Sequence, residues 1–170
     1  MRVGLGFDAH RFEDARPLVL GGIVIPDAPG LSGHSDADVL SHAITDACLG
    51  AARLGDLGAL YPETAEWKNA SSIDILRDAQ RRAMVEGWAI SSVDATLVAQ
   101  RPRLAPHRAA IVISLEQALA VEPGTVSVKA TSTDGLGFTG RAEGIAALAV
   151  VLMERTDARG QDATSFVEPA

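Results

Sequence analysis

Stretches with the two-residue period of a β-strand alternate with stretches typical of helices along this chain. Residues Arg2–His10 alternate apolar side chains with small or polar ones, which predicts a strand. The Gly21-Gly22 pair separates two short apolar runs and predicts a β-hairpin. Ser35-Asp36-Ala37-Asp38 and Ser71-Ser72-Ile73-Asp74 fit the capping box that begins a helix. Strands and helices mixed in this way predict an α+β fold with one mixed sheet.

The same patterns predict the remaining elements. We expect the first helix to end near Arg53 and the second to end at Gly87, a residue type common at helix C-termini. Further strands are predicted at Ile90–Gln100 and Thr125–Thr131, a further helix from about Pro106 with Ile111, Leu115, Ala118 and Leu119 on its buried face, and loops at 26–37 and 54–70. Residues Ile145–Met153 are ambiguous, because a short apolar run fits either a helix or a buried strand.

Length and charge restrict the class of protein. The 170 residues include 15 Lys plus Arg and 22 Asp plus Glu, which gives a net charge of −7 with His neutral. At roughly 150 residues per domain this is one domain, which we expect to occupy residues 1–155. Residues 156–170 are polar without periodicity and are expected to form a flexible tail. An acidic chain is a poor partner for polymeric nucleic acid, whose binding depends on Lys and Arg.

The apolar segments and the cysteine content favour a soluble cytoplasmic protein. Residues Met1–His10 lack the pattern of a secretory signal. The most apolar segment, Gly144–Met153, is too short to span a bilayer as a helix, so no membrane association is expected. Cys48 is the only cysteine, so an intrachain disulfide cannot form.

A group of histidines and aspartates has the spacing of a metal site. Asp8 and His10 are two residues apart on a predicted strand, so their side chains point to the same face. His42 and Asp46 are four residues apart on a predicted helix, on the side opposite its apolar stripe. Two His and one Asp suit Zn²⁺ and leave a fourth position open. Asp46 could orient the ring of His42, or it could be a solvated helix carboxylate.

Two further segments could handle phosphate or a base. Lys129–Gly135 carries three hydroxyls and Asp134, which could hold Mg²⁺ beside phosphate oxygens, although Ser/Thr runs are also common in ordinary strands. Gly135–Arg141 lacks the spacing of a P-loop, and Arg141 is either an anion partner or a surface residue. Ala99–His107 could read a base edge through its backbone or could simply connect a strand to a helix.

Together these segments resemble the 2-C-methyl-D-erythritol 2,4-cyclodiphosphate synthase family of the non-mevalonate isoprenoid pathway. The resemblance runs in order from Met1 to about residue 155. The matching stretches are Gly6-Phe7-Asp8-Ala9-His10, His34-Ser35-Asp36-Ala37-Asp38, His42-Ala43-Ile44-Thr45-Asp46-Ala47, Leu54-Gly55-Asp56-Leu57-Gly58, Val128-Lys129-Ala130-Thr131 and Gly137-Phe138-Thr139-Gly140-Arg141-Ala142-Glu143-Gly144.

The resemblance implies a set of site residues. The zinc ligands it implies are Asp8, His10 and His42, and Asp134 falls where the family has a Glu that holds a second ion, Mg²⁺ or Mn²⁺. His34 and Ser132 fall at positions of transition-state stabilisation, with Ser132 in place of the usual Thr. The implied contacts to the methylerythritol phosphate are Ser35, Asp56, Gly58, Tyr61, Glu63, Thr64 and Ala65. Those to the cytidine diphosphate are Ala99, Arg103, Leu104, Ala105, Thr131 and Thr133, and Phe138 and Arg141 fall where some members bind isoprenoid diphosphates.

The resemblance also implies the architecture and the reaction. We expect a mixed β-sheet with helices packed on one face and a small β-hairpin, with 145–153 as a strand. We expect a homotrimer whose three sheets face a central axis and whose active sites lie at subunit interfaces. The implied reaction is that of a phosphorus–oxygen lyase: 4-diphosphocytidyl-2-C-methyl-D-erythritol 2-phosphate cyclises and releases CMP. The alternatives are a metal-dependent phosphodiesterase and a non-catalytic binder of isoprenoid diphosphates.

Overall fold

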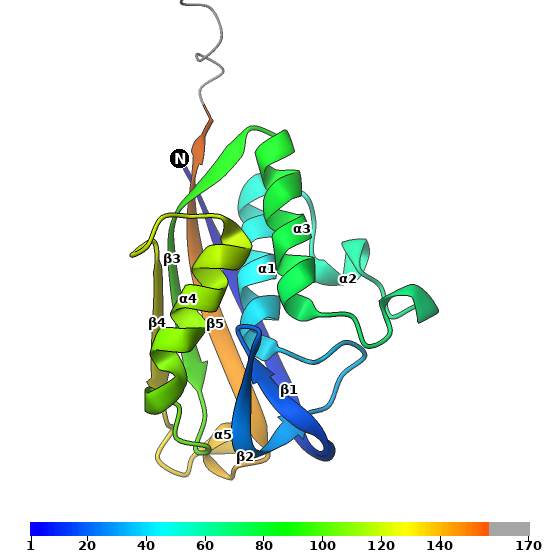
Figure 1. Ribbon diagram of the computed structural model, residues 1–170, viewed down its shortest axis with the longest axis vertical. Coiled ribbons are helices and arrows are strands. Elements are labelled where there is room, and N and C mark those ends of the chain that lie inside the picture. Colours follow the sequence, from blue (N-terminus) through cyan, green and yellow to red (C-terminus); the bar gives the residue numbers. More distant parts are fainter. Residues whose placement is uncertain (157–170) are drawn as a thin grey trace, which may run out of the picture.

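Five strands form one mixed sheet in the order β2-β1-β5-β3-β4 (Figure 1). The computed structural model describes residues 1–156, so the predicted tail lies outside the described residues except for Thr156. The strands are β1 Arg2–Leu20, β2 Ile23–Leu31, β3 Trp88–Val98, β4 Val126–Thr131 and β5 Gly144–Arg155. β3 and β4 are parallel and every other neighbouring pair is antiparallel, which confirms the predicted mixed sheet.

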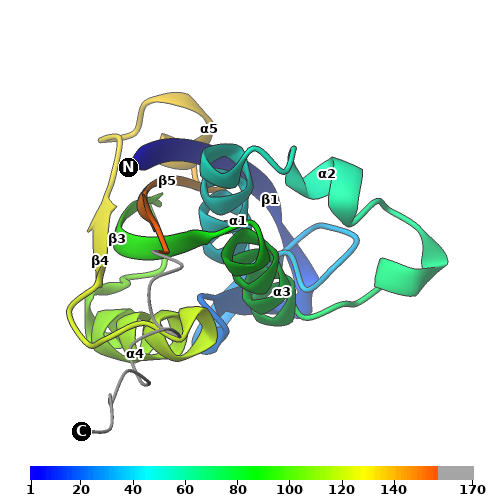
Figure 2. The same cartoon turned by 90° about the horizontal axis from the view of Figure 1, so that it is seen from above.

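Three long helices cover one face of this sheet, as expected. Figure 2 shows the sheet curving around α1, α3 and α4, with the segment that carries α2 projecting to one side. The helices are α1 Val39–Ala52, α2 Leu57–Leu60, α3 Ser72–Val85, α4 Arg108–Leu119 and α5 Gly137–Gly140, with 3₁₀ turns η1 Ala65–Trp67 and η2 Ala105–His107. Within residues 1–156, none of these helices has the length and apolar character needed to cross a membrane.

Several sequence predictions hold and others need correction. β5 confirms that 145–153 is a strand, and the hairpin turns at Gly21 and Gly22, both with positive φ. The first capping box is wrong, because the N-cap of α1 is Asp38, whose carboxylate accepts from the backbone N–H groups of Leu40 and Ser41. The loop predicted at 26–37 begins only after Leu31, and the loop at 54–70 contains α2 and η1.

Two glycines on β1 allow α1 to lie directly on the strand. A Cβ at Gly4 would lie 1.8 Å from the carbonyl oxygen of Ala47, and a Cβ at Gly6 would lie 1.9 Å from that of Ala43. Any larger residue would therefore push the helix away from the sheet. Asp8 and His10 follow on the same face of β1, so this close approach brings them under His42 of α1.

The other face of the sheet carries apolar side chains that none of the helices within residues 1–156 covers. On β1, Val3, Leu5 and Phe7 are 67%, 68% and 57% exposed. The register of β1 with β5 places Phe7 beside Leu148 and Leu5 beside Val150, both also exposed. An exposed apolar patch of this kind typically marks a surface of association.

Candidate active site

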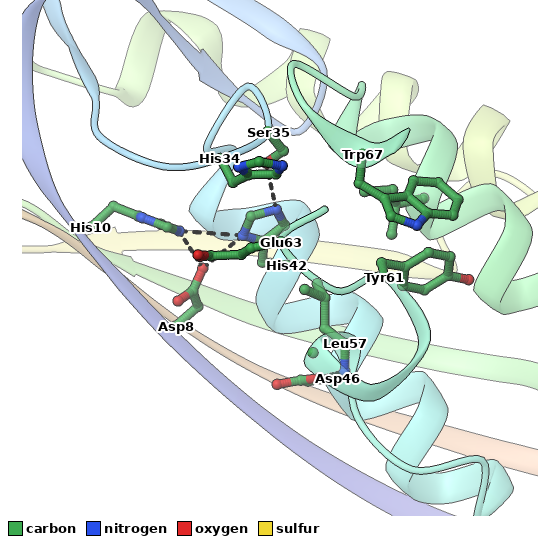
Figure 3. A pocket seen from close by; sticks show the side chains of 12 residues that line it. Asp8, His10, His34, Ser35, His42, Asp46, Leu57, Tyr61, Glu63 and Trp67 are labelled. Carbon is green, nitrogen blue, oxygen red and sulfur yellow. Dashed lines mark hydrogen bonds and ion pairs between the residues drawn. The ribbon is translucent and has the colours of Figure 1, made fainter. Parts of the chain in front are cut away.

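Three side chains from β1 and α1 converge at one point (Figure 3). The Oδ2 atom of Asp8 lies 2.9 Å from Nε2 of His10 and 3.0 Å from Nδ1 of His42. The two imidazole nitrogens are 3.3 Å apart. All three candidate ligand atoms lie within 4.8 Å of one another, so the structure brings together the three residues predicted to bind zinc.

The remaining ring nitrogen of His10 is fixed by the backbone. Nδ1 of His10 lies 2.7 Å from the carbonyl oxygen of Ser32. Because a carbonyl oxygen only accepts hydrogen bonds, the proton of a neutral His10 lies on Nδ1. Nε2 therefore presents its lone pair to Asp8 and His42.

The partners of His42 correct one prediction. Nε2 of His42 lies 2.9 Å from Oγ of Ser72 and 3.1 Å from Oγ of Ser35. Asp46 does not orient this ring, because its Oδ1 accepts instead from the backbone N–H of Leu57 at 2.7 Å. Asp46 thus holds the start of α2, although it lines the same cavity as His42.

Asp8 and His10 shift each other's pKa. Burial alone would raise the pKa of Asp8, but hydrogen bonds and charge from His10 and His42 hold it well below its usual range. Burial alone would lower the pKa of His10, and the carboxylate of Asp8 outweighs this effect and raises it. The site therefore favours an ionised Asp8, whose charge in turn favours the protonated form of His10.

The group lies in a cavity of about 260 Å³. From the predicted site, the residues lining it are Asp8, His10, His34, Ser35, His42, Asp46, Gly58, Tyr61 and Glu63. Three apolar lining residues were not predicted, namely Leu57, Trp67 and Ile75. The ring of Trp67 packs edge-on against that of Tyr61, with centroids 5.0 Å apart. Aromatic residues in the otherwise polar 54–70 segment were the sequence signal that could have predicted this wall of the cavity.

Three other predicted residues form the frame of this cavity. Asp56 is the N-cap of α2 and accepts from the N–H of Ala59 at 2.8 Å. The carbonyl oxygen of Thr64 accepts from Nε2 of His34 at 2.6 Å, and Ala65 begins η1. The hydrogen bond from His34 ties the 61–67 segment to the loop that follows β2.

A second predicted group gathers at the ends of β3 and β4. The two strands are parallel, and the N–H of Ala99 donates to the carbonyl oxygen of Thr131 at 2.9 Å. Leu104 and Ala105 line a separate pocket of about 90 Å³ between α4 and these strands. Arg103 is exposed beside it. The strand end and the following turn are thus close to the hydroxyl segment after β4.

The hydroxyl segment itself is exposed. Ser132 donates to Oδ1 of Asp134 at 3.2 Å, and Thr133 donates to the carbonyl oxygen of Leu136 at 2.6 Å. Arg141 pairs with Glu143 through Nε at 2.7 Å, and Phe138 is 40% exposed. Ser132 and Asp134 therefore face outward, available to a ligand or to a second chain.

Within one chain, the Asp8–His10–His42 group lies apart from the residues at the ends of β3 and β4. The paired strands place Asp8, Ala147, Leu97 and Ala130 in one row across β1, β5, β3 and β4. Three strand spacings of roughly 4.8 Å separate the ends of this row by about 14 Å. Ala147 and Leu97 are buried between the ends, and the two pockets share no lining residue.

Comparison with known proteins identifies the family of this chain. Residues 1–154 match the model of the YgbB family. The chain belongs to the YgbB family. A 2-C-methyl-D-erythritol 2,4-cyclodiphosphate synthase from Syntrophomonas wolfei is 52% identical over 156 residues, which cover 91% of this chain and 99% of that protein.

Solved structures of similar proteins share the fold. A 2C-methyl-D-erythritol-2,4-cyclodiphosphate synthase in a CDP-bound form matches with a TM-score of 0.83 and 37% identity, covering 90% of this chain and 100% of that chain. The bifunctional IspDF from Campylobacter jejuni matches with a TM-score of 0.87 and 42% identity over 91% of this chain. The present chain spans only 42% of the length of that bifunctional protein.

The donor set of this YgbB-family chain fits a bound cation. In the neutral form of His10 the proton is on Nδ1, so the Nε2 lone pair faces Oδ2 of Asp8 at 2.9 Å, and a metal cation can take the place of the proton that bridges these atoms in the protonated form. A cation at the meeting point of the three ligand atoms would satisfy all of them at once. Two imidazoles and one carboxylate are a donor set that Zn²⁺ takes in catalytic sites, where a fourth position stays open for substrate.

Proposed function

We propose that this chain converts 4-diphosphocytidyl-2-C-methyl-D-erythritol 2-phosphate to 2-C-methyl-D-erythritol 2,4-cyclodiphosphate and CMP, as a phosphorus–oxygen lyase. An oxygen of the 2-phosphate attacks the β-phosphorus. The bond from that phosphorus to the bridging oxygen breaks, and CMP leaves with this oxygen. The observation that carries the proposal is the Asp8–His10–His42 group beside His34 and Ser35, in a chain 52% identical to a synthase of this name.

The proposal includes two divalent cations. Asp8, His10 and His42 would hold Zn²⁺, and Asp134 would help to hold Mg²⁺ or Mn²⁺ together with the substrate diphosphate. When bound, such ions neutralise charge on the phosphates and polarise the phosphorus that is attacked. Asp134 has a shorter side chain than Glu, so it would reach this ion more closely or through water.

The chain's own residues position the reacting groups. Ser35, Asp56, Gly58 and the 61–65 segment would hold the methylerythritol phosphate in the cavity beside the metal ligands. Ala99, Arg103, Leu104, Ala105, Thr131 and Thr133 would hold the cytidine diphosphate. His34 and Ser132 would donate hydrogen bonds to oxygens that gain charge in the transition state. Phosphoryl transfer needs little covalent chemistry from a protein, so positioning and electrostatics account for the rate.

We propose that the active site is completed by a second subunit of a homotrimer. Two observations support this assembly: the separation of the two groups in one chain, and the exposed apolar face of the sheet. Packing the three apolar faces around a central axis would bury Leu5, Phe7 and Val150 and could join the metal ligands of one chain to Ser132 of its neighbour. Phe138 and Arg141 would then be available to an isoprenoid diphosphate in the central cavity, and we expect the enzyme to act in the cytoplasm.

An assay of CMP release tests the reaction. Purified protein is supplied with Zn²⁺, Mg²⁺ and the substrate, and CMP release is followed with and without a strong chelator. We expect CMP and the cyclic diphosphate in equal amounts, and loss of both after chelation with recovery on re-addition of metal. A protein loaded with zinc that releases no CMP would overturn the proposal.

A further inference from the structure

A buried chain of hydrogen bonds lies behind His42, on the side of the ring away from Asp8. Ser72, the first residue of α3, is fully buried and its Oγ lies 2.9 Å from Nε2 of His42. The hydroxyl of Ser72 donates in turn to Oδ1 of Asp36. We propose that Asp36 and Ser72 are positioning residues that fix the proton of His42 on Nε2, so that Nδ1 is free to bind the metal.

The direction of each hydrogen bond follows from the groups around Asp36. Its carboxylate faces three donors: the hydroxyl of Ser72, the backbone N–H of Ser72 at 3.1 Å and the backbone N–H of Asp38 at 3.3 Å. The hydroxyl proton of Ser72 is therefore committed to Asp36. The Ser72 oxygen can then only accept from His42, since a hydroxyl has one proton and two lone pairs.

The second hydroxyl at the ring agrees with this assignment. Oγ of Ser35 lies 3.1 Å from Nε2 of His42 and 3.2 Å from Oγ of Ser72. It already accepts the backbone N–H of Ala37 at 3.1 Å, and its own proton can be donated to Ser72. With the proton of His42 on Nε2, the hydroxyls of Ser35 and Ser72 both have a donor and an acceptor. Nδ1 of His42 then carries no proton and faces Asp8.

A carboxylate at position 36 is required for this order. An Asn in its place would turn either an oxygen or an NH₂ group toward the Ser72 hydroxyl. In both orientations the NH₂ group would meet another donor, since all three neighbours donate. With the NH₂ group toward Ser72, the hydroxyl of Ser72 would lose its acceptor and be free to donate to Nε2, which favours the tautomer with its proton on Nδ1. Groups that orient a metal-binding His typically change metal affinity by about 10–100-fold when removed.

The test measures zinc affinity rather than catalysis. This inference rests on the proposed metal site but not on the identity of the reaction, so a chelator competition without substrate separates the two. We expect Ser72→Ala and Asp36→Asn to weaken Zn²⁺ binding by about 10–100-fold. The matched control is Ser41→Ala, which also removes a fully buried hydroxyl that donates to a carboxylate, Asp38, at 2.8 Å. The hydroxyl of Ser41 is not among the hydrogen-bond partners of the His42 ring, so zinc affinity should be unchanged.

The nitrogen-15 chemical shifts of the His42 ring provide a second measurement on the metal-free protein. We expect the proton on Nε2 in the wild type and a mixture of tautomers in Asp36→Asn. This measurement shows which nitrogen of His42 carries the proton even if Ser72→Ala fails to fold. The proposal is overturned if the wild type carries the proton on Nδ1, or if folded Asp36→Asn and Ser41→Ala bind zinc equally well.

Discussion

Nδ1 of His42 on α1 lies 3.0 Å from Oδ2 of Asp8 on β1, although 34 positions separate the two residues in the chain. The contact depends on how closely the helix lies on the strand, because Gly4 and Gly6 leave no side chain between them. The three candidate metal ligands are therefore positioned by backbone packing as much as by their own side chains.

Replacing His42 tests the ligand set. His42→Ala should lower zinc uptake by more than about 100-fold, because the loss of a ligand exceeds the effect of losing a group that only orients one. The fold should persist, since Ala is a good helix former. Zinc per chain after dialysis and far-ultraviolet circular dichroism provide the two readouts. His107→Ala is the control, because this His lies on η2, outside the metal cavity. Zinc content equal to that of wild type would exclude His42 as a ligand.

Replacing Gly6 tests the close approach of helix and strand. Gly6→Ala should lower the free energy of unfolding by about 3 kcal/mol or more, because the new Cβ would overlap the carbonyl oxygen of Ala43. Gly50→Ala is the matched control. It lies within α1 with no atom within 4 Å of a new Cβ, and it should stabilise the protein by up to about 1 kcal/mol. Urea titration compares the two, and equal stability of Gly6→Ala and wild type would contradict the packing argument.

The grouping of the three candidate metal ligands could be predicted from the sequence, because metal binding needs specific residue types at fixed periods. Asp8 and His10 share a face through the two-residue period of β1, and His42 lies off the apolar stripe of α1. The orienting partner of His42 could not be found in this way. Ser72 reaches it from α3, thirty positions along the chain, and only tertiary packing makes that contact. Asp46 has the helical spacing needed to reach His42, but its carboxylate accepts the backbone N–H of Leu57 at the start of α2 instead.

Element boundaries were less predictable than element types. Ser35 has the residue type of an N-cap, yet its hydroxyl lies in the cluster behind His42 while Asp38 caps α1. The strand β2 continues through Pro26 and Pro29 because it is an edge strand, where a missing N–H costs little. Local signals therefore predicted which elements form, whereas buried polar contacts decide where each one begins.

Tyr61, the only tyrosine, gives a pH-dependent test of the cavity wall. Burial, together with the hydrogen bond from its hydroxyl to Asp78 at 2.9 Å, raises the pKa of Tyr61 to about 12. The unfolded chain loses this proton at a lower pH, near the ordinary value of 10.0. The contribution of Tyr61 to stability is therefore intact below about pH 10 and decreases, by about 2 kcal/mol, as the pH rises toward 12.

Ultraviolet absorbance of the phenolate measures this pKa directly. Asp78→Asn should move the midpoint down toward the ordinary value, because the acceptor charge near the phenol is removed. Asp74→Asn on the same helix should leave it unchanged, since Asp74 pairs with Arg77 and not with Tyr61. A wild-type midpoint near 10 would show that the hydroxyl is not held by Asp78 in solution.

Mixed oligomers test whether the active site is shared between chains. His42→Ala removes a ligand from the Asp8–His10–His42 group, and Asp134→Ala removes the carboxylate from the segment that follows β4. Each variant should therefore be inactive alone. In a randomly mixed 1:1 cyclic trimer, about one quarter of the interfaces combine two intact halves, so about one quarter of wild-type activity should return. Mixtures that stay inactive despite exchange of subunits would show that each site is built within one chain.

The fate of water oxygen tests the central claim most directly. When the reaction is run in oxygen-18 water, the account predicts a cyclic diphosphate and CMP that both lack the label, because the attacking oxygen comes from the substrate's own 2-phosphate. A linear methylerythritol bisphosphate that carries one labelled oxygen would instead identify a metal-dependent phosphodiesterase and would contradict the account.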